Sequence, residues 1–291
     1  NMIRDWQIEQ QSPIDQHRAA AAAEYPSLWA HMISQWRSPG DDRAWLIYAA
    51  NYLFRTGGLR WALDPLTLHQ RLPQAHPVDP AGLSELSFVL LTHRHADHLD
   101  LDLIRALRPY PIRWVIPEFL LPQIIEQVGL LESQVSVPRP LQPIAIGNIT
   151  ITPFDGLHWE PLPSAGGTPR GVPAMGYLVE FSGRRWLFPG DVRNYDLRLL
   201  PDFGPLDGVF AHLWLGRGTA LQDAPPLLEV FCAFFAHLPT RRLVVTHLHE
   251  LGRRAEEYWD ERHYQAVAAR LHQLNPNLRV EPALLGRSLA L

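Results

Sequence analysis

The sequence predicts one large α/β domain preceded by a helical segment. From Ala44 onward, short apolar strands alternate with helical stretches, which is typical of α/β folds. The chain has 291 residues, of which 46% are hydrophobic and 19% are charged, so one domain of this size can bury a sizeable core. We therefore divide the chain into an N-terminal helical extension, residues 1–43, and a main domain, residues 44–291.

The N-terminal segment is expected to be helical over residues 12–37. Its alanine run at residues 19–23 has high helix propensity, whereas Pro26 is expected to separate two short helices. We expect the apolar stripe of this segment to pack on the domain surface, with a dimer contact or a wall of a substrate channel as the alternatives. The stripe consists of residues that recur at helical spacing, namely Leu28, Met32, Ile33 and Trp36.

The main domain shows its elements as apolar runs separated by turn-forming residues. Strands are predicted for residues 57–64, 86–91, 149–154, 186–191 and 242–247, and helices for residues 101–107, 119–128, 227–237 and 256–274.

The densest group of chemically active side chains directly follows the second of these strands. Residues 92–100 read Thr-His-Arg-His-Ala-Asp-His-Leu-Asp. A strand places His93 and His95 on the same face. A turn after it can bring Asp97 and His98 to the same place. Imidazole and carboxylate are preferred ligands of zinc, manganese and iron, so this spacing predicts a metal site. A solvated histidine-rich loop would account for one or two histidines but not for four ligand-type residues.

Further ligand-type residues follow other predicted strands. Taken singly, each has an ordinary explanation, because aspartate before proline forms turns and a lone histidine is more often a hydrogen-bonded polar residue. With its His-x-His-x-Asp-His motif the sequence resembles the metallo-β-lactamase superfamily, and these further residues occur together in the order that this resemblance implies. Side chains at the ends of several strands would then build one site. These residues are Asp64, His158, Asp191 and His247.

Over residues 45–291 the chain resembles the metallo-β-lactamase superfamily, whose mark is His-x-His-x-Asp-His. Residues 174–185 and 285–287 are similar to the branch that contains L-ascorbate-6-phosphate lactonase and N-acylphosphatidylethanolamine-hydrolysing phospholipase D. Two positions depart from that branch. Val192 stands where the branch usually has threonine after Gly-Asp, and His249 adds a second histidine shortly after His247.

The resemblance implies a four-layer αββα sandwich with the site at one edge of two packed sheets, so that residues 44–291 form a catalytic domain. It also implies two divalent metal ions, for which zinc is the first choice and manganese the second. Carried onto this sequence, the ligands of the first ion are His93, His95 and His158, those of the second are Asp97, His98 and His247, and Asp191 bridges the two.

The implied reaction is a hydrolysis. Two metal ions about 3.5–4 Å apart trap a hydroxide that attacks a carbonyl carbon or a phosphorus atom. We expect cleavage of a phosphodiester or a lactone-type ester in a small molecule, and the residues do not separate the two. In this scheme Asp97 also orients the nucleophile, and Asp64 fixes a histidine through its far nitrogen. His249 is assigned a supporting role or a substrate contact, with metal ligation and a surface position as alternatives.

Substrate contacts are expected from the segment after His158. Residues 159–173 are rich in proline and glycine and are interpreted either as a lid over the site or as a plain surface loop. Arg170 and Arg193 are candidates for a bidentate contact with a phosphate or carboxylate. Trp159 and Trp214 are candidate pocket walls.

The competing hypothesis is an iron-dependent oxidoreductase of the same fold, either a sulfur dioxygenase or a diiron enzyme. The dioxygenases work with one iron, which leaves His98 and His247 without a clear use. The diiron enzymes depend on a flavin domain or partner, and the sequence contains no flavodoxin-like segment. Both considerations favour the hydrolase.

Charge and composition limit the classes of binding partner and the cellular location that we expect for this protein. The formal net charge of −4 argues against a nucleic-acid partner, which would require a basic face. The apolar run at residues 227–238 is shorter than the roughly 20 residues that span a bilayer, so no integral membrane segment is expected. We see no signal-peptide pattern, and the single Cys232 cannot form an internal disulfide, so the expected location is cytoplasmic. The sequence leaves open whether the chain forms a homo-oligomer.

Overall fold

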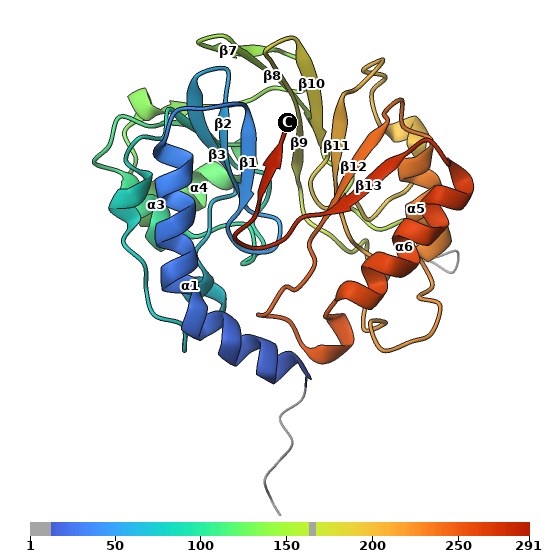
Figure 1. Ribbon diagram of the computed structural model, residues 1–291. Coiled ribbons are helices and arrows are strands. Elements are labelled where there is room, and N and C mark those ends of the chain that lie inside the picture. Colours follow the sequence, from blue (N-terminus) through green and yellow to red (C-terminus); the bar gives the residue numbers. More distant parts are fainter. Residues whose placement is uncertain (1–12, 163–166) are drawn as a thin grey trace, which may run out of the picture.

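The chain folds into four layers, two β-sheets face to face between two layers of helices, as the sequence predicts (Figure 1). The computed structural model describes residues 13–162 and 167–291. The helices are α1 (Pro13–Arg37), α2 (Leu68–Arg71), α3 (Leu101–Leu107), α4 (Leu121–Val128), α5 (Leu228–Ala236) and α6 (Glu261–Leu274). In Figure 1, α1, α3 and α4 lie on one outer side of the sandwich, and α5 and α6 lie on the other.

The first sheet is formed mainly by the N-terminal half of the chain. Its strand order is β14-β1-β2-β3-β4-β5-β6, with antiparallel pairing from β14 to β3 and parallel pairing from β3 to β6. Side chains alternate along β3, so Trp61 and Leu63 face the other sheet while Ala62 faces the helices. The strands are β1 (Arg43–Leu46), β2 (Tyr52–Thr56), β3 (Leu59–Leu63), β4 (Phe88–Leu90), β5 (Arg113–Val115), β6 (Val135–Ser136) and β14 (Ser288–Ala290).

The second sheet is formed by the C-terminal half. Its order is β13-β12-β11-β10-β9-β8-β7, with parallel pairing from β10 to β13 and antiparallel pairing from β7 to β10. The strands are β7 (Ile144–Ile146), β8 (Ile149–Asp155), β9 (Met175–Phe181), β10 (Arg184–Phe188), β11 (Gly208–His212), β12 (Arg242–Thr246) and β13 (Arg279–Pro282).

Aromatic rings fill the space between the two sheets. Trp61 stacks on Phe54 with 3.8 Å between ring centroids, and on Phe88 with 5.3 Å. Phe188 and Phe210 stack in the second sheet at 4.7 Å, and Phe54 meets Phe188 edge-on across the gap at 5.3 Å. These rings are fully buried, so they fix the separation of the sheets, from whose ends the loops of the site depart.

The prediction that Pro26 divides the N-terminal helix is wrong. A single helix, α1, runs from Pro13 to Arg37 with Pro26 inside it, and Figure 1 shows that it bends along its length. Proline in a helix interior costs about 3 kcal/mol, because it removes a hydrogen bond and crowds the preceding turn. Burial of Tyr25, Trp29, Met32 and Trp36 against the first sheet offsets that cost by holding both sides of Pro26 on one core.

The strand before the histidine motif is shorter than predicted. β4 ends at Leu90, so His93 and His95 lie in a loop and not on one face of a strand. Their rings still meet edge-on, with 4.8 Å between centroids. A local turn gathers the motif, since the amides of His98 and Leu99 both donate to the carbonyl of His95 at 2.9 Å.

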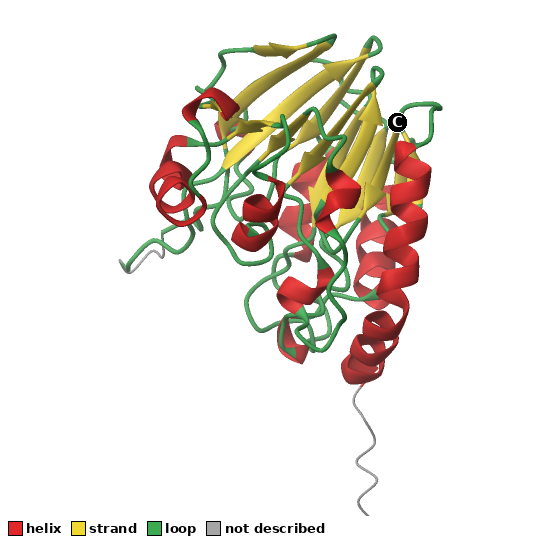
Figure 2. Cartoon of the chain, turned by 90° about the vertical axis from the view of Figure 1, so that its left-hand side faces the viewer, coloured by secondary structure: helices red, strands yellow, loops and turns green. Residues whose placement is uncertain are grey.

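Long loops gather along one edge of the two sheets (Figure 2). The loops that follow β3, β4, β8, β10 and β12 carry Asp64, the histidine motif, His158, Asp191 and His247. Parallel strands present their carboxyl ends at the same edge of a sheet, and ligand sites of α/β folds occur there. The fold therefore brings residues far apart in the sequence to one place.

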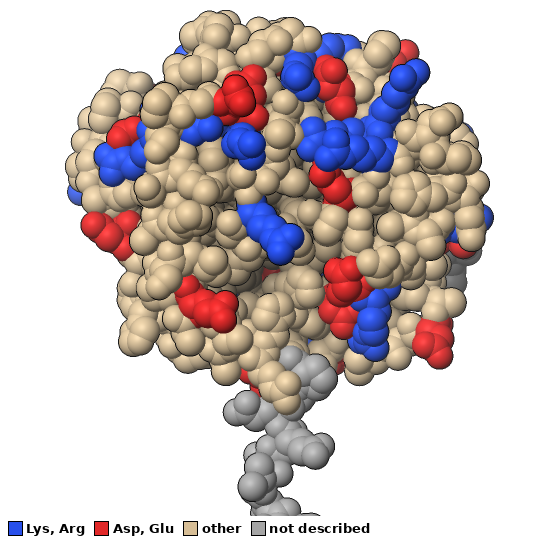
Figure 3. All heavy atoms as spheres, viewed as in Figure 1, with Lys and Arg blue, Asp and Glu red and all other residues tan. Residues whose placement is uncertain are grey.

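Surface charge and helix length bear on the classes of partner expected from the sequence. On the face drawn in Figure 3, acidic and basic side chains are interspersed. Within residues 13–162 and 167–291, the helices lack the length and apolar character that crossing a bilayer would require.

Candidate metal centre

The first group of candidate ligands consists of His93, His95, His158 and Asp191. One ligand atom from each of these residues lies within 4.8 Å of the others. Nε2 of His93 and Nε2 of His158 lie 3.7 Å and 3.9 Å from Oδ2 of Asp191. Both nitrogens are buried, and no described residue forms a hydrogen bond with either of them. Buried polar atoms are rarely left without a partner, so the donor set fits a bound cation.

The second group consists of Asp97, His98 and His247. Nε2 of His247 lies 3.1 Å from Oδ2 of Asp97, and one ligand atom of His98 lies within 4.8 Å of both residues. Asp191 also faces this group through its other oxygen, with Oδ1 3.3 Å from Nε2 of His98 and 3.9 Å from Nδ1 of His247. Asp191 thus presents Oδ2 to the first group and Oδ1 to the second, which is the orientation of a bridging carboxylate.

Asp64 lies behind the second group and holds His98 in place. Its Oδ2 is 2.8 Å from Nδ1 of His98, and Thr92 donates its amide to Oδ1 at 2.8 Å and its hydroxyl to Oδ2 at 2.5 Å. With Nδ1–H bonded to a carboxylate, Nε2 of His98 points into the centre and is the nitrogen that would release its proton to ligate a cation. Asn51 fixes the backbone around this arrangement, because its side-chain amide donates to the carbonyls of Asp64 (2.7 Å) and Asp97 (2.9 Å).

His212 belongs to the centre although it is not among the residues predicted from the sequence. It is the last residue of β11, is buried, and its Nδ1 lies 2.8 Å from Oδ1 of Asp191. Its Nε2 is buried without a hydrogen-bond partner. The signal that could have identified it is the apolar run of residues 209–211 followed by histidine, the same pattern that singled out His247.

Arg253 is a second residue of the centre that was not predicted. Its Nη2 donates to Oδ2 of Asp97 at 3.2 Å and lies 3.3 Å from Nε2 of His247. On its other side, Nε lies 3.2 Å from Oε2 of Glu250, a carboxylate that also accepts from Tyr48 and Arg71. The second group therefore already has a guanidinium cation beside it, and no local spacing in the sequence indicates this.

Charges in the centre are set by burial and by mutual contact. Burial lowers the pKa of His95 to about 4 and that of His158 to about 3, so both are neutral at pH 7, as metal ligands must be. Burial alone would also lower the pKa of His98, but the charges of Asp191 and Asp97 raise it well above the usual value. Burial opposes ionisation of Asp191, yet the histidines around it hold its pKa well below the usual range. The metal-free centre thus carries carboxylates and a protonated His98.

His249 lies outside all four groups of residues, among those described, that could hold a cation. Its Nδ1 is 3.0 Å from the hydroxyl of Tyr258, and its ring meets that of His17 edge-on at 5.0 Å between centroids. The structure therefore places this predicted catalytic residue against α1, away from the ligands.

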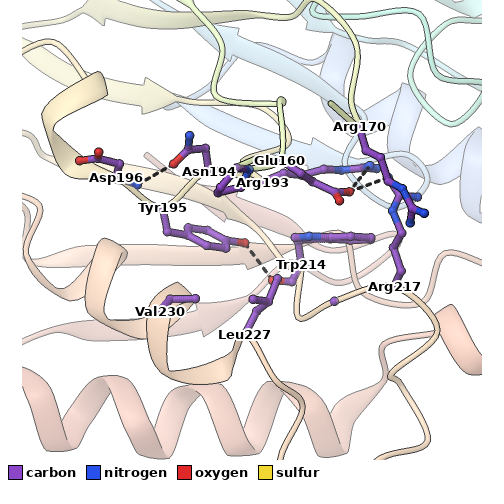
Figure 4. Close-up of a pocket in the computed structure, with 12 residues that line it drawn as sticks. Glu160, Arg170, Arg193, Asn194, Tyr195, Asp196, Trp214, Arg217, Leu227 and Val230 are labelled. Carbon is purple, nitrogen blue, oxygen red and sulfur yellow. Dashed lines mark hydrogen bonds and ion pairs between the residues drawn. The ribbon is translucent and has the colours of Figure 1, made fainter. Parts of the chain in front are cut away.

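A cavity of about 620 Å³ lies beside the centre (Figure 4). Arg170, Arg193 and Trp214, three of the four predicted substrate contacts, line it, whereas the fourth, Trp159, is 43% exposed and is not part of its wall. Glu160 and Arg217 also line the cavity and were not predicted. A smaller cavity of about 430 Å³ shares Arg170, Arg193 and Arg217 and reaches His95 of the first group.

The loop of residues 159–173, for which the sequence leaves open a lid or a plain surface loop, is held by hydrogen bonds of its backbone amides near both of its ends. The amide of Glu160 donates to the carbonyl of Arg170 at 2.7 Å, and residues 163–166 at its centre lie outside the described residues. The amide of Val172 donates to Nδ1 of His158 at 3.2 Å. His158 must give up this contact when its Nε2 binds a cation.

Residues 60–248 match the family model described as "Beta-lactamase superfamily domain". Among solved structures, the chain is similar to an isothiocyanate hydrolase from Delia radicum gut bacteria, with 19% identity, a TM-score of 0.58, and coverage of 86% of this chain and 98% of that one. It is also similar to Igni18, a metallo hydrolase from Ignicoccus hospitalis KIN4/I, with 13% identity, a TM-score of 0.59, and coverage of 85% and 97%.

A third similar structure is CmlA, a diiron β-hydroxylase from Streptomyces venezuelae, with 18% identity, a TM-score of 0.58, and coverage of 87% of this chain and 55% of that one. The chain thus spans about half the length of CmlA. At these identities the similarity shows the fold alone. No protein with a curated description matches the chain in sequence.

Proposed function

The chain belongs to the β-lactamase superfamily, and on that premise we propose that it is a hydrolase that uses two divalent cations, zinc or manganese, to cleave a phosphodiester or a lactone-type ester in a small molecule. One observation carries the proposal. Asp191 lies between two groups of imidazoles, with one carboxylate oxygen facing each group. A shared carboxylate can hold two cations close together, which is the arrangement that hydrolysis by a pair of cations uses.

Each group of ligands has an assigned ion. His93, His95 and His158 would hold one cation, Asp97, His98 and His247 would hold the other, and Asp191 would contact both. When bound, the cations supply a water molecule of lowered pKa as the nucleophile and polarise the oxygen of the scissile group. No serine or cysteine nucleophile is then needed.

The chain's own residues prepare the centre for this chemistry. Asp64 fixes the orientation and tautomer of His98, and His212 fixes Asp191 through Oδ1. Asp97 is held by His247 and by Arg253, so its carboxylate stays ionised and keeps one orientation. These contacts hold the ligands before a substrate arrives, which limits the reorganisation that the reaction requires.

The substrate would approach along the cavity that reaches His95. This histidine is half-buried, whereas His93 and His158 are fully buried, so it marks the open side of the first group. Arg170, Arg193 and Arg217 line the same opening. An ester that enters here meets guanidinium groups before it meets the ligands.

Metal counting tests the assignment of the second group. The purified protein should hold two metal equivalents by elemental analysis, and His98→Ala should lose about one equivalent together with hydrolytic activity. His31→Ala, which removes an exposed histidine from α1, is the matched control and should change neither. A wild-type protein that binds no divalent ion when properly loaded would overturn the proposal.

Substrate panels test the reaction. Turnover of bis-p-nitrophenyl phosphate, compared with turnover of a set of lactones, separates the phosphodiesterase from the lactonase. Activity on neither would contradict both. The same donor set suits iron, so the competing hypothesis is an iron-dependent oxidoreductase. Iron at stoichiometry, an iron ultraviolet–visible spectrum and no hydrolysis would favour that alternative.

A further inference from the structure

The larger cavity beside the metal centre has a cationic end and an apolar end. Figure 4 shows Arg170, Arg193 and Arg217 gathered around one end of the Trp214 indole, with Leu227 and Val230 on the other side. The cationic end is the one that continues to His95.

The cationic end holds more positive than negative charge. Of the described side chains, Glu160 is the carboxylate that pairs with these arginines, and its Oε1 is shared between Nη2 of Arg217 at 2.6 Å and Nη1 of Arg193 at 3.3 Å. Among the described residues, none pairs with the Arg170 side chain. Three guanidinium groups against one carboxylate leave a formal excess of two positive charges, which attracts an anion.

Arg193 has donor capacity that the protein does not use. The side chain is only 8% exposed, and its guanidinium lies over the Trp214 ring at 4.3 Å from the centroid. Its Nε is buried and has no hydrogen-bond partner within residues 13–162 and 167–291. A buried charged donor without a partner is strongly disfavoured, so this N–H is poised to bind an oxygen atom supplied by a ligand.

The apolar end offers surface for a hydrocarbon or aromatic body. Val230 on α5 is 45% exposed although it faces the cavity, and Leu227 is half-buried beside it. The Trp214 ring forms the wall between this end and the arginines, and its backbone carbonyl is held by the hydroxyl of Tyr195 at 2.8 Å.

From this arrangement we infer that the protein acts on an organic oxyanion with an apolar body. Arg193, Arg217 and Arg170 bind the phosphate or carboxylate oxygens, and the Trp214, Leu227 and Val230 side chains contact the body. The inference rests on the proposed hydrolase function and names the substrate class of the same site. Bidentate contacts from guanidinium groups suit planar or tetrahedral oxyanions better than neutral groups.

Equilibrium binding of phenylphosphonate to the metal-loaded protein tests the cationic end. Phenylphosphonate is an aromatic oxyanion without a hydrolysable ester bond, and benzyl alcohol is its neutral counterpart. Wild type should bind the phosphonate at least about tenfold more tightly than the alcohol. The double variant Arg170→Gln/Arg217→Gln should lose about tenfold or more of this affinity, because it removes two charged donors from half-exposed or exposed positions.

Arg279→Gln is the matched control for charge. This arginine is 67% exposed on β13 and is not part of either cavity wall, so its loss should leave phosphonate binding unchanged. Equally tight binding by the double variant and by wild type would assign the anion to the metal ions alone and would overturn the inference.

Glu160→Gln should raise the affinity for phenylphosphonate, which the double arginine variant should lower. Removing the carboxylate frees the donors of Arg193 and Arg217 and raises the formal excess to three positive charges, so phosphonate affinity should rise about threefold. An unchanged or lower affinity would contradict the role assigned to the arginines.

The apolar end is tested by comparing phenylphosphonate with methylphosphonate. Wild type should prefer the phenyl compound about tenfold, and Val230→Asp should abolish most of that preference. Ile125→Asp, on α4 and 41% exposed, is the matched control and should retain it. If wild type bound phenylphosphonate no more tightly than methylphosphonate, the inferred contact of an apolar substrate body with Trp214, Leu227 and Val230 would be contradicted.

These measurements separate the inference from the proposed hydrolase function. Arginine-dependent phosphonate binding without hydrolysis of any ester would support the inference and contradict the hydrolase. A second comparison uses the anionic diester ethyl p-nitrophenyl phosphate and the neutral triester diethyl p-nitrophenyl phosphate. If the protein hydrolysed both with equal catalytic efficiency and the double variant changed neither rate, the hydrolase would be supported and the inference overturned.

Discussion

Asp64 and His98, which are 34 residues apart in the sequence, form a buried carboxylate–imidazole pair with Oδ2 2.8 Å from Nδ1. Both side chains are fully buried. The pair directs the remaining nitrogen of His98 toward Asp191. Asp64, which belongs to neither the first nor the second group, therefore sets the orientation of the candidate ligand His98.

Asp64→Asn is expected to weaken cation binding at the second group by about 10–100-fold while the first group keeps its ion. Both oxygens of Asp64 accept hydrogen bonds, from Thr92 and from His98. Asparagine replaces one of these oxygens with an NH₂ group, which cannot accept a hydrogen bond from either residue. Competitive chelator titration with metal analysis measures the affinity of each equivalent. Asp79→Asn, at an exposed cap of a short surface turn, is the control. Undiminished binding of the second equivalent would contradict the role of Asp64.

Arg253→Met is expected to destabilise the metal-free protein by about 3 kcal/mol and the metal-loaded protein by less. Removing one partner of a buried ion pair leaves Asp97 and Glu250 without their shared cation. A metal ion on Asp97 would replace part of that charge. Urea unfolding with and without the metal gives the difference.

The neighbouring Arg254→Met, at a position that is 74% exposed, provides the comparison and should have little effect in either state. Equal destabilisation of the metal-free and the loaded protein by Arg253→Met would show that the guanidinium acts independently of cation binding.

His249→Ala tests the sequence-based expectation that His249 serves the reaction. Because this side chain bonds Tyr258 and packs against His17, we expect a loss of about 1 kcal/mol in the free energy of unfolding, with unchanged metal content and an unchanged turnover rate. His17→Ala disturbs the same contacts from α1 and should behave alike. If turnover instead fell by about two orders of magnitude or more in His249→Ala alone, this histidine would have a catalytic role.

The metal-free protein should lose stability as the pH falls from 6.5 to about 4. In the unfolded chain His95 and His158 take up protons near pH 6.5, whereas in the folded protein their pKa values are about 4 and 3. The unfolded state then binds more protons, so the free energy of unfolding decreases with decreasing pH. His98 opposes this trend only near pH 6.5, where the unfolded chain is still taking up the proton that the folded protein already holds. Below about pH 5.5 it is protonated in both states and adds no slope.

His158 contributes at most about 1.4 kcal/mol per pH unit to the slope of the unfolding free energy against pH, and the half-exposed His95 contributes less. Urea midpoints measured across this range give the slope, and His158→Gln should reduce it. A flat profile between pH 6.5 and 4 in wild type would contradict the pKa values assigned to these histidines.

Local patterns were sufficient to predict an α/β chain with a metal-binding histidine motif. The resemblance to the metallo-β-lactamase superfamily added the four-layer sandwich and the other side chains that gather at the edge of the sheets. Asp64, His158, Asp191 and His247 each follow an apolar strand closely, and the histidine motif lies within a few residues of another. Because carboxyl ends of parallel strands meet, strand order and local spacing together contain this information. The strand length before the motif was overestimated, since an apolar run does not reveal where the ladder of hydrogen bonds stops.

Local sequence patterns do not indicate residues of the site that lie outside any motif. His212 ends an apolar run and could have been selected as His247 was, but no local spacing indicates Arg253, Arg217 or Glu160. The contact of Arg253 with Asp97 joins residues 156 positions apart. Such contacts form only when segments far apart in the sequence pack on each other in the folded protein.

Hydrophobic periodicity and backbone chemistry act over a few residues, so the order of amino acids alone sets which segments become strands and which side chains stand at their ends. Packing in three dimensions sets how Asp191 divides its two oxygens, keeps Pro26 inside one helix, and gathers three arginines around one carboxylate beside Trp214. These outcomes depend on burial and on contacts between distant segments, whose energies exceed the local preferences of the residues involved.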